Sequence, residues 1–375
     1  MLPVDLKITC DKLTQCAIND DCPDLNLTLD CPNLVLVESY YQIKYLYIKS
    51  ASDRLVINAP VHKLKISKLT ELSETAAASL VALSICDTRF DVQSNLSRLE
   101  ELRALHLYNC RVTNLRSLSR LITILSLVNC QFEPFESLPH VRYLTLEDAP
   151  YTFTAEILNR FSILNLCAVE FTGELTRNII LKNYPVDRVK QCLLFNCCNL
   201  TIGKCDNLIV DEIGLMHGLT FSRCNGLQLN FTSQRLDQLS IKKCSFVLNI
   251  NTTLNYLSFS KCLFSTFIVR PGLLRDHACV TFSECSALQS ITDDEPMIHM
   301  LKVELCDLLT SIRKCAPHYV ENNMCYWLNP DDTRLRNLIF LQRALRQLSR
   351  RRRLRKFKEL YEYMPRELAD LVARY

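Results

Sequence analysis

Cysteine and histidine are the residues of this chain with the widest chemistry, so their spacing decides which reactions it could support. The 375 residues include 20 cysteines and 7 histidines. The cysteines form no C-x-x-C pair, the usual spacing of structural zinc ligands. The histidines form no H-E-x-x-H or H-x-x-x-H pair, and no G-x-S-x-G elbow presents a nucleophilic serine. We therefore predict no catalytic residue and no metal site, and we expect the chain not to be an enzyme.

Two chemical alternatives are weaker than this interpretation. Cys306, Cys315 and Cys325 could combine with His318 to bind a metal ion. A cysteine could also act as a nucleophile beside a histidine that is distant in sequence. Both compete with a simpler explanation, in which most of the cysteines are buried structural residues.

Glycine content argues against nucleotide cofactors. The chain has 6 glycines, and no two of them form the G-x-G pair of phosphate-binding loops. Such loops need glycine because the backbone must approach the phosphate closely. We therefore expect no cofactor.

Composition indicates a globular chain, and the N-terminus suggests its compartment. The chain is 48% hydrophobic and 22% charged, which excludes a disordered protein. The opening "MLPVDLKITC" lacks the basic start and apolar core of a signal peptide. No run reaches the roughly 18 apolar residues of a membrane span. We therefore expect a cytoplasmic or nuclear protein without a transmembrane segment, although a high cysteine count is also typical of secreted proteins.

The elements that position the cysteines repeat along the chain. Leu102, Leu105, Leu107 and Cys110 follow the spacing L-x-x-L-x-L-x-x-C, and Ile122–Cys130 repeats it. The shorter frame L-x-L-x-x-C returns from Cys205 onward at steps of 18 to 23 residues. The eight cysteines of the frame are Cys110, Cys130, Cys205, Cys224, Cys244, Cys262, Cys285 and Cys306. Three imperfect copies lie between Cys130 and Cys205, namely Leu144-x-Leu146 with Ala149, Leu164-x-Leu166 with Val169, and Cys192-x-Leu194 with Cys197.

This pattern resembles the leucine-rich repeat, whose consensus is L-x-x-L-x-L-x-x-(N/C)-x-L. The resemblance covers roughly residues 40 to 315 and is specific in the two complete copies. It implies a solenoid that stacks one short strand per repeat into a parallel sheet, and a role in binding other proteins. Extracellular members of the family often have a disulfide-bonded N-terminal cap, and Cys10, Cys16, Cys22 and Cys31 lie at that place.

Elementary packing explains why cysteine suits its place in the frame. Alternating apolar residues such as Leu105 and Leu107 point one face of a strand inward. The chain must turn two residues later, while its backbone is still buried. A cysteine there is small, apolar and a weak S–H donor. We therefore expect a structural ladder of free thiols stacked from coil to coil rather than disulfides.

We expect three segments. Residues 1–35 form an N-terminal cap, residues 36–325 a leucine-rich-repeat-like solenoid, and residues 326–375 a basic C-terminal helical segment. The coils of the parallel β-sheet hold about 20 residues, with short strands or helices on the back. The stretches "TAAASLVAL" and "SNLSRLEEL" favour short helices, and residues 170–190 fit neither pattern and are expected to be an irregular coil.

A basic stripe is the candidate partner-binding site. In consecutive coils the residue before the cysteine is basic, and a further lysine lies beside it. The stripe consists of Lys204, Arg223, Lys242, Lys243 and Lys261. Stacked coils would space these charges about 5 Å apart, one strand spacing. We expect either a docking strip for an acidic protein or ordinary solvated charge.

The C-terminal segment concentrates positive charge. Residues 333–358 hold eleven Arg or Lys and no acid, while residues 1–332 hold 31 basic and 36 acidic residues, a net charge of −5. The densest run comprises Arg350, Arg351, Arg352, Arg353, Arg355, Lys356 and Lys358. Three interpretations remain open: a helix that caps the solenoid, a nuclear-import or nucleic-acid-binding patch, and a helix that docks on an anionic membrane or a protein.

Three functions follow from these patterns. The first is a non-enzymatic scaffold or adaptor for protein–protein interactions, built on leucine-rich repeats. The second is a nucleic-acid-associated or nuclear protein that uses the Arg-rich helix. The third is a secreted or cell-surface recognition module. The identity of the partner and the oligomeric state do not follow from sequence, because ligand choice in this fold depends on exposed positions.

Overall fold

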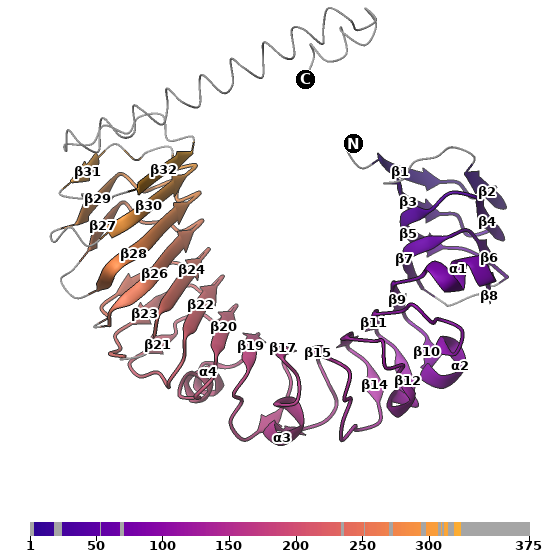
Figure 1. Ribbon diagram of the computed structural model, residues 1–375, viewed down its shortest axis with the longest axis horizontal. Helices are drawn as coiled ribbons and strands as arrows, with labels where there is room; N and C mark the ends of the chain where they lie inside the picture. Colours follow the sequence, from indigo (N-terminus) through magenta and orange to yellow (C-terminus); the bar gives the residue numbers. More distant parts are fainter. Residues whose placement is uncertain are drawn as a thin grey trace, which may run out of the picture. The chain divides into compact units, whose positions relative to one another are not determined.

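Coils of a parallel β-solenoid make up the described part of the chain in the computed structural model (Figure 1). The structure describes residues 4–18, 25–52, 54–67, 71–233, 236–250, 252–269, 273–293, 298–306, 309, 311–313 and 319–323. It divides into two compact units, which we describe separately. Unit 1 comprises Met1–Cys205 and Gly214–Met216, and unit 2 comprises Asp206–Ile213 and the residues from His217 onward.

Unit 1 has one long parallel sheet at the front, with one strand from each coil. Its strands are β1 (Val4–Thr9), β3 (Leu25–Asp30), β5 (Ile43–Ser50), β7 (Val61–Ile66), β9 (Ala82–Cys86), β11 (Ala104–Tyr108), β13 (Ile124–Val128), β15 (Tyr143–Glu147), β17 (Ile163–Cys167), β19 (Asn178–Lys182) and β20 (Asn199–Gly203). Equivalent frame residues pair in register, as Leu105 with Leu125 and Leu107 with Leu127.

Short strands and a few short helices form the back of unit 1. The back strands are β2 (Gln15–Ile18), β4 (Leu36–Ser39), β6 (Val56–Asn58), β8 (Glu71–Leu72), β10 (Arg89–Asp91), β12 (Arg111–Thr113), β14 (Gln131–Phe132), β16 (Phe153–Thr154) and β18 (Phe171–Thr172). The helices are α1 (Glu74–Ser79), α2 (Val92–Leu96), α3 (Ala155–Leu158) and α4 (Val186–Leu193), with a 3-10 turn at Leu115–Ser117. The predicted fold of parallel coils with short strands or helices on the back is thus confirmed.

Local capping explains where the first two helices begin. Ser73 accepts a hydrogen bond from the Ala76 backbone N–H and starts α1. Asp91 starts α2 in the same way, at 2.8 Å from the Ser94 nitrogen. Asp91 also accepts bonds from the Thr113 and Asn114 side chains of the next coil. The bond from the Ser94 N–H, together with these side-chain bonds, lowers the pKa of Asp91 to about 2. One carboxylate therefore caps a helix and links two coils.

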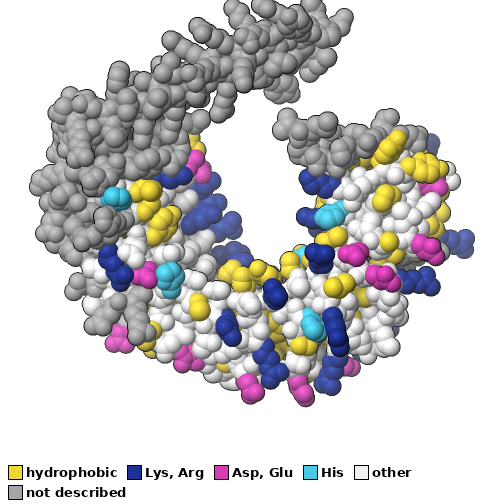
Figure 2. All heavy atoms as spheres, viewed as in Figure 1, with side chains coloured by type: hydrophobic (Ala, Val, Ile, Leu, Met, Phe, Trp, Pro, Cys, Tyr) yellow, Lys and Arg dark blue, Asp and Glu magenta, His cyan; other side chains and the backbone are white. Residues whose placement is uncertain are grey.

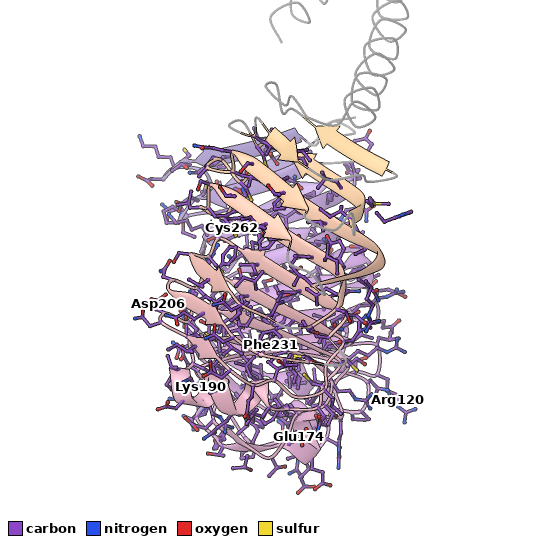
Figure 3. All side chains as sticks on the ribbon, turned by 90° about the vertical axis from the view of Figure 1, so that its left-hand side faces the viewer. Arg120, Glu174, Lys190, Asp206, Phe231 and Cys262 are labelled. Atoms are coloured by element: carbon purple, nitrogen blue, oxygen red, sulfur yellow. The ribbon has the colours of Figure 1, made fainter. Side chains whose placement is uncertain are left out.

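Unit 2 repeats the arrangement with strands on both sides. The front strands are β22 (Gly218–Ser222), β24 (Gln238–Lys242), β26 (Leu254–Ser260), β28 (Leu274–Ser283), β30 (Ile298–Glu304) and β32 (Tyr319–Asn323). The back strands are β21 (Ile209–Val210), β23 (Leu227–Leu229), β25 (Phe246–Leu248), β27 (Thr266–Val269), β29 (Ser290–Asp293) and β31 (Ser311–Arg313). Phe231 and Cys262 are fully buried in this unit, whereas Asp206 lies at its surface (Figure 3).

Phenylalanine fills the interior of unit 2, where both sides of the coil are strands. The Phe259 ring stacks on Phe282 of the next front strand at 5.5 Å between centroids. Phe267 of the back strand meets both rings edge-on, at 5.1 and 5.3 Å. Buried aromatic pairs in such geometries add about 0.5–1.5 kcal/mol each beyond their area burial.

One imperfect copy of the frame was assigned wrongly. Cys192 and Leu194, which we predicted on a strand, lie in and just after α4. Their coil instead uses Ile179 and Leu181 of β19, so residues 170–190 are a regular coil and not an irregular one. The basic C-terminal segment, which begins at residue 326, lies outside the described residues.

Candidate functional site

The frame cysteines lie just beyond the front strands, inside the coil. Cys110 and Cys130 are each 2% exposed. The Cys110 backbone N–H donates to the Cys130 sulfur across 3.4 Å, and the Cys130 thiol lies 3.3 Å from the carbonyl oxygens of Leu107 and Val128. Each sulfur therefore satisfies buried backbone groups where the strand ends and the chain turns.

The same arrangement recurs in unit 2. The Cys224 backbone N–H donates to the Cys244 sulfur at 3.3 Å, and the Cys262 thiol lies 3.2 Å from the Ile241 carbonyl oxygen. Burial raises the pKa of the Cys262 thiol. All 17 cysteines in the described part of the chain are free thiols, and the eight frame cysteines are buried among them.

A left-handed residue follows the front strand in most coils, and it precedes the cysteine in all eight coils that carry a frame cysteine. In unit 1 this residue is mostly Asn or Asp, for example Asn109 at φ 53° and Asn129 at φ 50°. The side chains join across coils, because the Asn129 amide donates to Asn109 and the Asn109 amide donates to Asp87, both at 2.8 Å. Asn and Asp adopt this conformation more readily than other residues with a Cβ.

The basic stripe occupies this left-handed position. Lys204 in unit 1 and Arg223, Lys243 and Lys261 in unit 2 have φ values of 56°, 59°, 54° and 55°. They therefore lie one residue beyond the strands, along the edge where the front strands end, and not on the flat sheet face. All four are exposed, and so is Lys242, the last residue of β24.

Backbone hydrogen bonds hold the unit 2 members of the stripe in place. The Arg223 N–H donates to the Lys242 carbonyl oxygen, and the Lys243 and Lys261 N–H groups donate to Ser260 and Ser283, each at 2.8 Å. The Lys261 ammonium pairs with Glu284 of the next coil at 2.8 Å. Among the described residues, Arg223, Lys242 and Lys243 form no ion pair. We call Arg223, Lys242, Lys243 and Lys261 the basic edge. Figure 2 shows Lys and Arg side chains gathered on the side of unit 2 that carries the front strands.

Small polar side chains cover the sheet face beside the basic edge. Thr220, Ser240, Ser258 and Thr281 pair in register on β22, β24, β26 and β28. Each of these residues lies between the two apolar positions of the frame. The result is a flat, hydroxyl-lined surface bordered by cations on one side.

The chain was compared with family models, curated proteins and solved structures. No family model, curated protein or solved structure matches this chain. The fold is therefore established from the coils themselves.

The described residues also bear on metal binding and membrane insertion. They contain no group of three or more His, Cys, Asp or Glu side chains placed to hold a metal ion. Of the alternative metal cluster, Cys315, His318 and Cys325 lie outside the described residues. Among the described residues, none of the helices has the length and apolar content needed to cross a membrane.

A second cationic surface was missed in the sequence. Lys63 and Lys65 of β7 lie on the front face of unit 1 near Tyr45 and Tyr47 of β5. The Lys65 ammonium is 4.8 Å from the centroid of the Tyr47 ring. The alternation in "IKYLYIKS" and "VHKLKI" could have indicated it, but neither stretch carries a frame cysteine.

Proposed function

We propose that this chain is a non-enzymatic interaction scaffold of the leucine-rich-repeat class that binds an acidic protein partner. The basic edge carries the proposal, because it presents its exposed cations at the ends of the consecutive strands β22, β24 and β26. Parallel strands are about 4.8 Å apart, so these charges are dense enough to match a run of carboxylates.

Backbone conformation supports a binding role for the basic edge. A left-handed residue with a Cβ costs roughly 1–2 kcal/mol, and Asn or Asp would reduce that cost. Unit 1 uses Asn or Asp at most of these positions, whereas unit 2 places Arg223, Lys243, Lys261, Glu284 and Leu305 there. Residues that keep a strained conformation without a local benefit are often functional.

The leucine-rich-repeat assignment is supported by the two complete copies of the consensus. In the copy that ends at Cys110, Leu105 and Leu107 are the inward residues of β11, and the cysteine closes the turn. The buried free thiols favour a cytoplasmic or nuclear location, where reducing conditions keep cysteine unpaired.

Charge reversal of the basic edge tests the proposal. In pull-downs from lysate compared by mass spectrometry, the Arg223→Glu/Lys243→Glu/Lys261→Glu chain should lose the proteins that the wild type retains. The matched control is Arg111→Glu/Arg116→Glu/Arg120→Glu, which changes net charge equally at exposed positions of unit 1 (Arg120 is labelled in Figure 3). A direct assay with a poly-glutamate peptide should show the same difference. Equal capture by wild type and the first triple variant would contradict the proposal.

The Arg-rich segment supports a second function, nucleic-acid association or nuclear import. It rests on the eleven basic residues between 333 and 358, which lie outside the described residues. Binding to a polyanion through this segment should fall steeply with salt and disappear on deletion of 333–375. A fluorescent fusion that stays nuclear after the deletion would argue against an import role.

A further inference from the structure

The front face of the first coils of unit 1 carries an isolated group of cations. Strands β1, β3, β5, β7, β9 and β11 contain five lysines, two aspartates, and no arginine or glutamate. The next five front strands, β13 to β20, contain one lysine, Lys182, and one acid, Glu147. The excess of positive over negative charge in the front strands of unit 1 is therefore limited to its first coils.

Both aspartates of this surface already have partners. Asp30 pairs with the Lys49 ammonium at 2.6 Å and accepts a bond from the Ser50 hydroxyl, and these two bonds lower its pKa. Asp5 accepts a hydrogen bond from the Asn26 amide at 2.8 Å. Within the described residues, Lys7, Lys63 and Lys65 form no ion pair, so their charge is available to a ligand.

Tyrosine rings lie among these lysines. The Lys65 ammonium lies 4.8 Å from the Tyr47 ring centroid and 5.9 Å from that of Tyr108. The two rings are therefore no farther apart than the sum of these distances. Between β7 and β11, β9 places the small residues Ser84 and Cys86 on the face. The two rings and Lys65 thus lie beside a strip of the sheet face that carries only small side chains.

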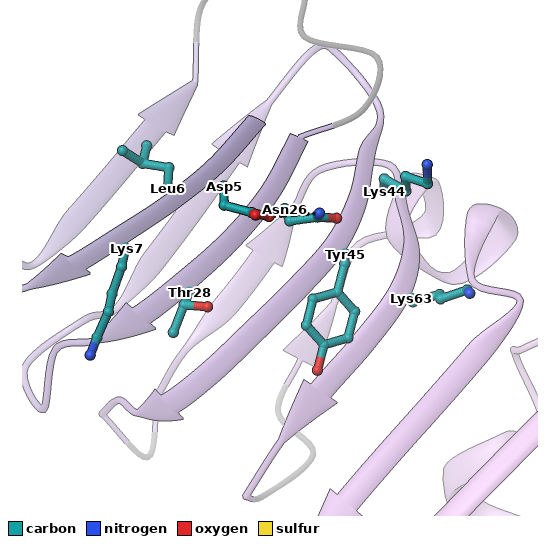
Figure 4. A pocket seen from close by; sticks show the side chains of 8 residues that line it. All are labelled: Asp5, Leu6, Lys7, Asn26, Thr28, Lys44, Tyr45 and Lys63. Atoms are coloured by element: carbon teal, nitrogen blue, oxygen red, sulfur yellow. Dashed lines mark hydrogen bonds between the residues drawn. The ribbon is translucent and has the colours of Figure 1, made fainter. Parts of the chain in front are cut away.

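A depression adjoins this strip. It has a volume of about 520 Å³ and lies over β1, β3, β5 and β7. Figure 4 shows Lys7, Thr28 and Tyr45 projecting from neighbouring strands, with Lys63 on the next strand. Burial raises the pKa of the Tyr45 hydroxyl. Cations, hydroxyls and a tyrosine ring therefore line this open hollow, together with Leu6 and the hydrogen-bonded pair of Asp5 and Asn26.

We propose that this surface, formed by Lys7, Tyr45, Tyr47, Lys63, Lys65 and Tyr108, binds single-stranded nucleic acid. Lysines on a sheet neutralise phosphates, and half-buried rings beside them offer flat faces on which unpaired bases stack. An acidic protein would use the lysines but would have no bases to place on the rings. A duplex would present phosphates while keeping its bases stacked inside. The combination of rings and cations favours the single strand.

Fluorescence anisotropy with the full-length chain tests the proposal. The probes are fluorescein-labelled 12-mers of uridylate and thymidylate, which separate RNA from DNA as the source of the strand. Lys63→Glu/Lys65→Glu should weaken binding at least tenfold near physiological salt. It should also reduce the slope of log Kd against log salt by about 1.4, from about 0.7 per lost phosphate contact. Tyr47→Leu should weaken binding at least about fivefold through lost stacking.

Matched controls lie on the same sheet. Lys182→Glu removes a front-face lysine of β19, and Tyr143→Leu removes an exposed tyrosine of β15. Both should bind within twofold of the wild type. Thermal melting of every variant separates loss of binding from loss of folding. Ultraviolet cross-linking of the wild-type chain to the uridylate probe needs no substitution, and it should label peptides that contain Tyr47 or Tyr108.

Several results would overturn the proposal. One is binding by Lys63→Glu/Lys65→Glu that equals the wild type, which would place all binding elsewhere, as in the Arg-rich segment. Cross-links confined to other peptides would also reject it. A 12-base-pair duplex or poly-glutamate of equal charge that competes as well as the single strand would show that the rings do not contribute. The proposal for unit 2 would be unaffected, because its test alters different coils.

Discussion

The place that cysteine fills in most coils is filled by Tyr184 in the coil of β19. Its hydroxyl donates to the Val169 carbonyl oxygen at 2.8 Å and accepts from the Val169 N–H at 3.1 Å. Burial raises the pKa of this hydroxyl. The position therefore requires a side chain that can satisfy buried backbone groups of a neighbouring coil, and a thiol or a phenol can both do so.

Tyr184→Phe should destabilise the chain. The substitution keeps the ring but leaves the Val169 N–H and carbonyl without a partner in the interior, at a cost of about 1–3 kcal/mol. Urea unfolding measures the change in free energy of unfolding. Tyr143→Phe is the control, because Tyr143 is 46% exposed, and its effect should stay within about 0.5 kcal/mol. Equal stability of the two variants would contradict this account of the turn.

Asp91 should make stability depend on acidity. Its pKa is about 2 in the folded chain, below the ordinary value of 3.8. The unfolded chain therefore binds a proton first, so the contribution of Asp91 is present above pH 3.8 and is lost as the pH falls through about 2. Asp91→Asn keeps a capping side chain but removes this titration. The melting temperature should fall less between pH 4 and pH 2 in Asp91→Asn than in the wild type. An equal fall in both proteins would exclude a role for Asp91.

At the scale of the element, the turn after each front strand explains what sequence could and could not predict. The alternation of Leu105 and Leu107 predicted a strand correctly, since inward residues of a strand must recur every second position. Cys192 and Leu194 matched that spacing by chance. Val189, Cys192 and Leu193 are buried at helical spacing, while Leu194 is 51% exposed. Counting apolar residues at the helical spacing as well as at the strand spacing would have distinguished this helix from a strand.

The left-handed turn itself escaped prediction. Asn109 and Asn129 are residue types that favour it, but Lys243, Ala168 and Leu305 adopt it too. No pattern of residue types therefore marks the position in all coils. For the same reason the sequence placed the basic stripe before the cysteines but did not indicate that its members lie in left-handed turns along the edge of the sheet. Its residues could be predicted, but its geometry could not.

Lys243→Asn should stabilise the chain and weaken partner binding. Asn relieves part of the cost of a left-handed φ of 54°, so we expect a gain of about 0.5–1 kcal/mol in the free energy of unfolding. Lys242→Asn alters the neighbouring exposed cation at the end of β24 and should bring no such gain. Denaturant titration of both variants provides the comparison. A loss of stability in Lys243→Asn would show that the lysine contributes contacts beyond its charge.

At the scale of the whole molecule, the pairing state of the cysteines bears on the compartment that we propose. The described cysteines are free, and the sulfurs of the frame cysteines serve as hydrogen-bond partners of the backbone. A ladder of this kind differs from a disulfide framework, because equivalent residues of successive coils have no fixed pairwise partner. The chain can therefore be stable without covalent links between its coils.

The chain is purified from the cytosol and then unfolded without reductant, so that buried thiols can react. Thiol titration should then find close to 20 free thiols. Reductant should leave the melting temperature unchanged. A low thiol count that rises on reduction, together with a fall in melting temperature, would favour the secreted alternative. Mass spectrometry of alkylated peptides would then identify the paired cysteines.

The pairing of the front strands has a mechanical consequence. In unit 1 the hydrogen bonds between strands run from one coil to the next, along the direction in which the coils stack. A pull applied along that direction loads these bonds in series, so the coils should peel away one after another at low force. Each peeled coil of about 20 residues would lengthen the chain by on the order of 70 Å. The stack of coils should therefore extend in steps of similar size.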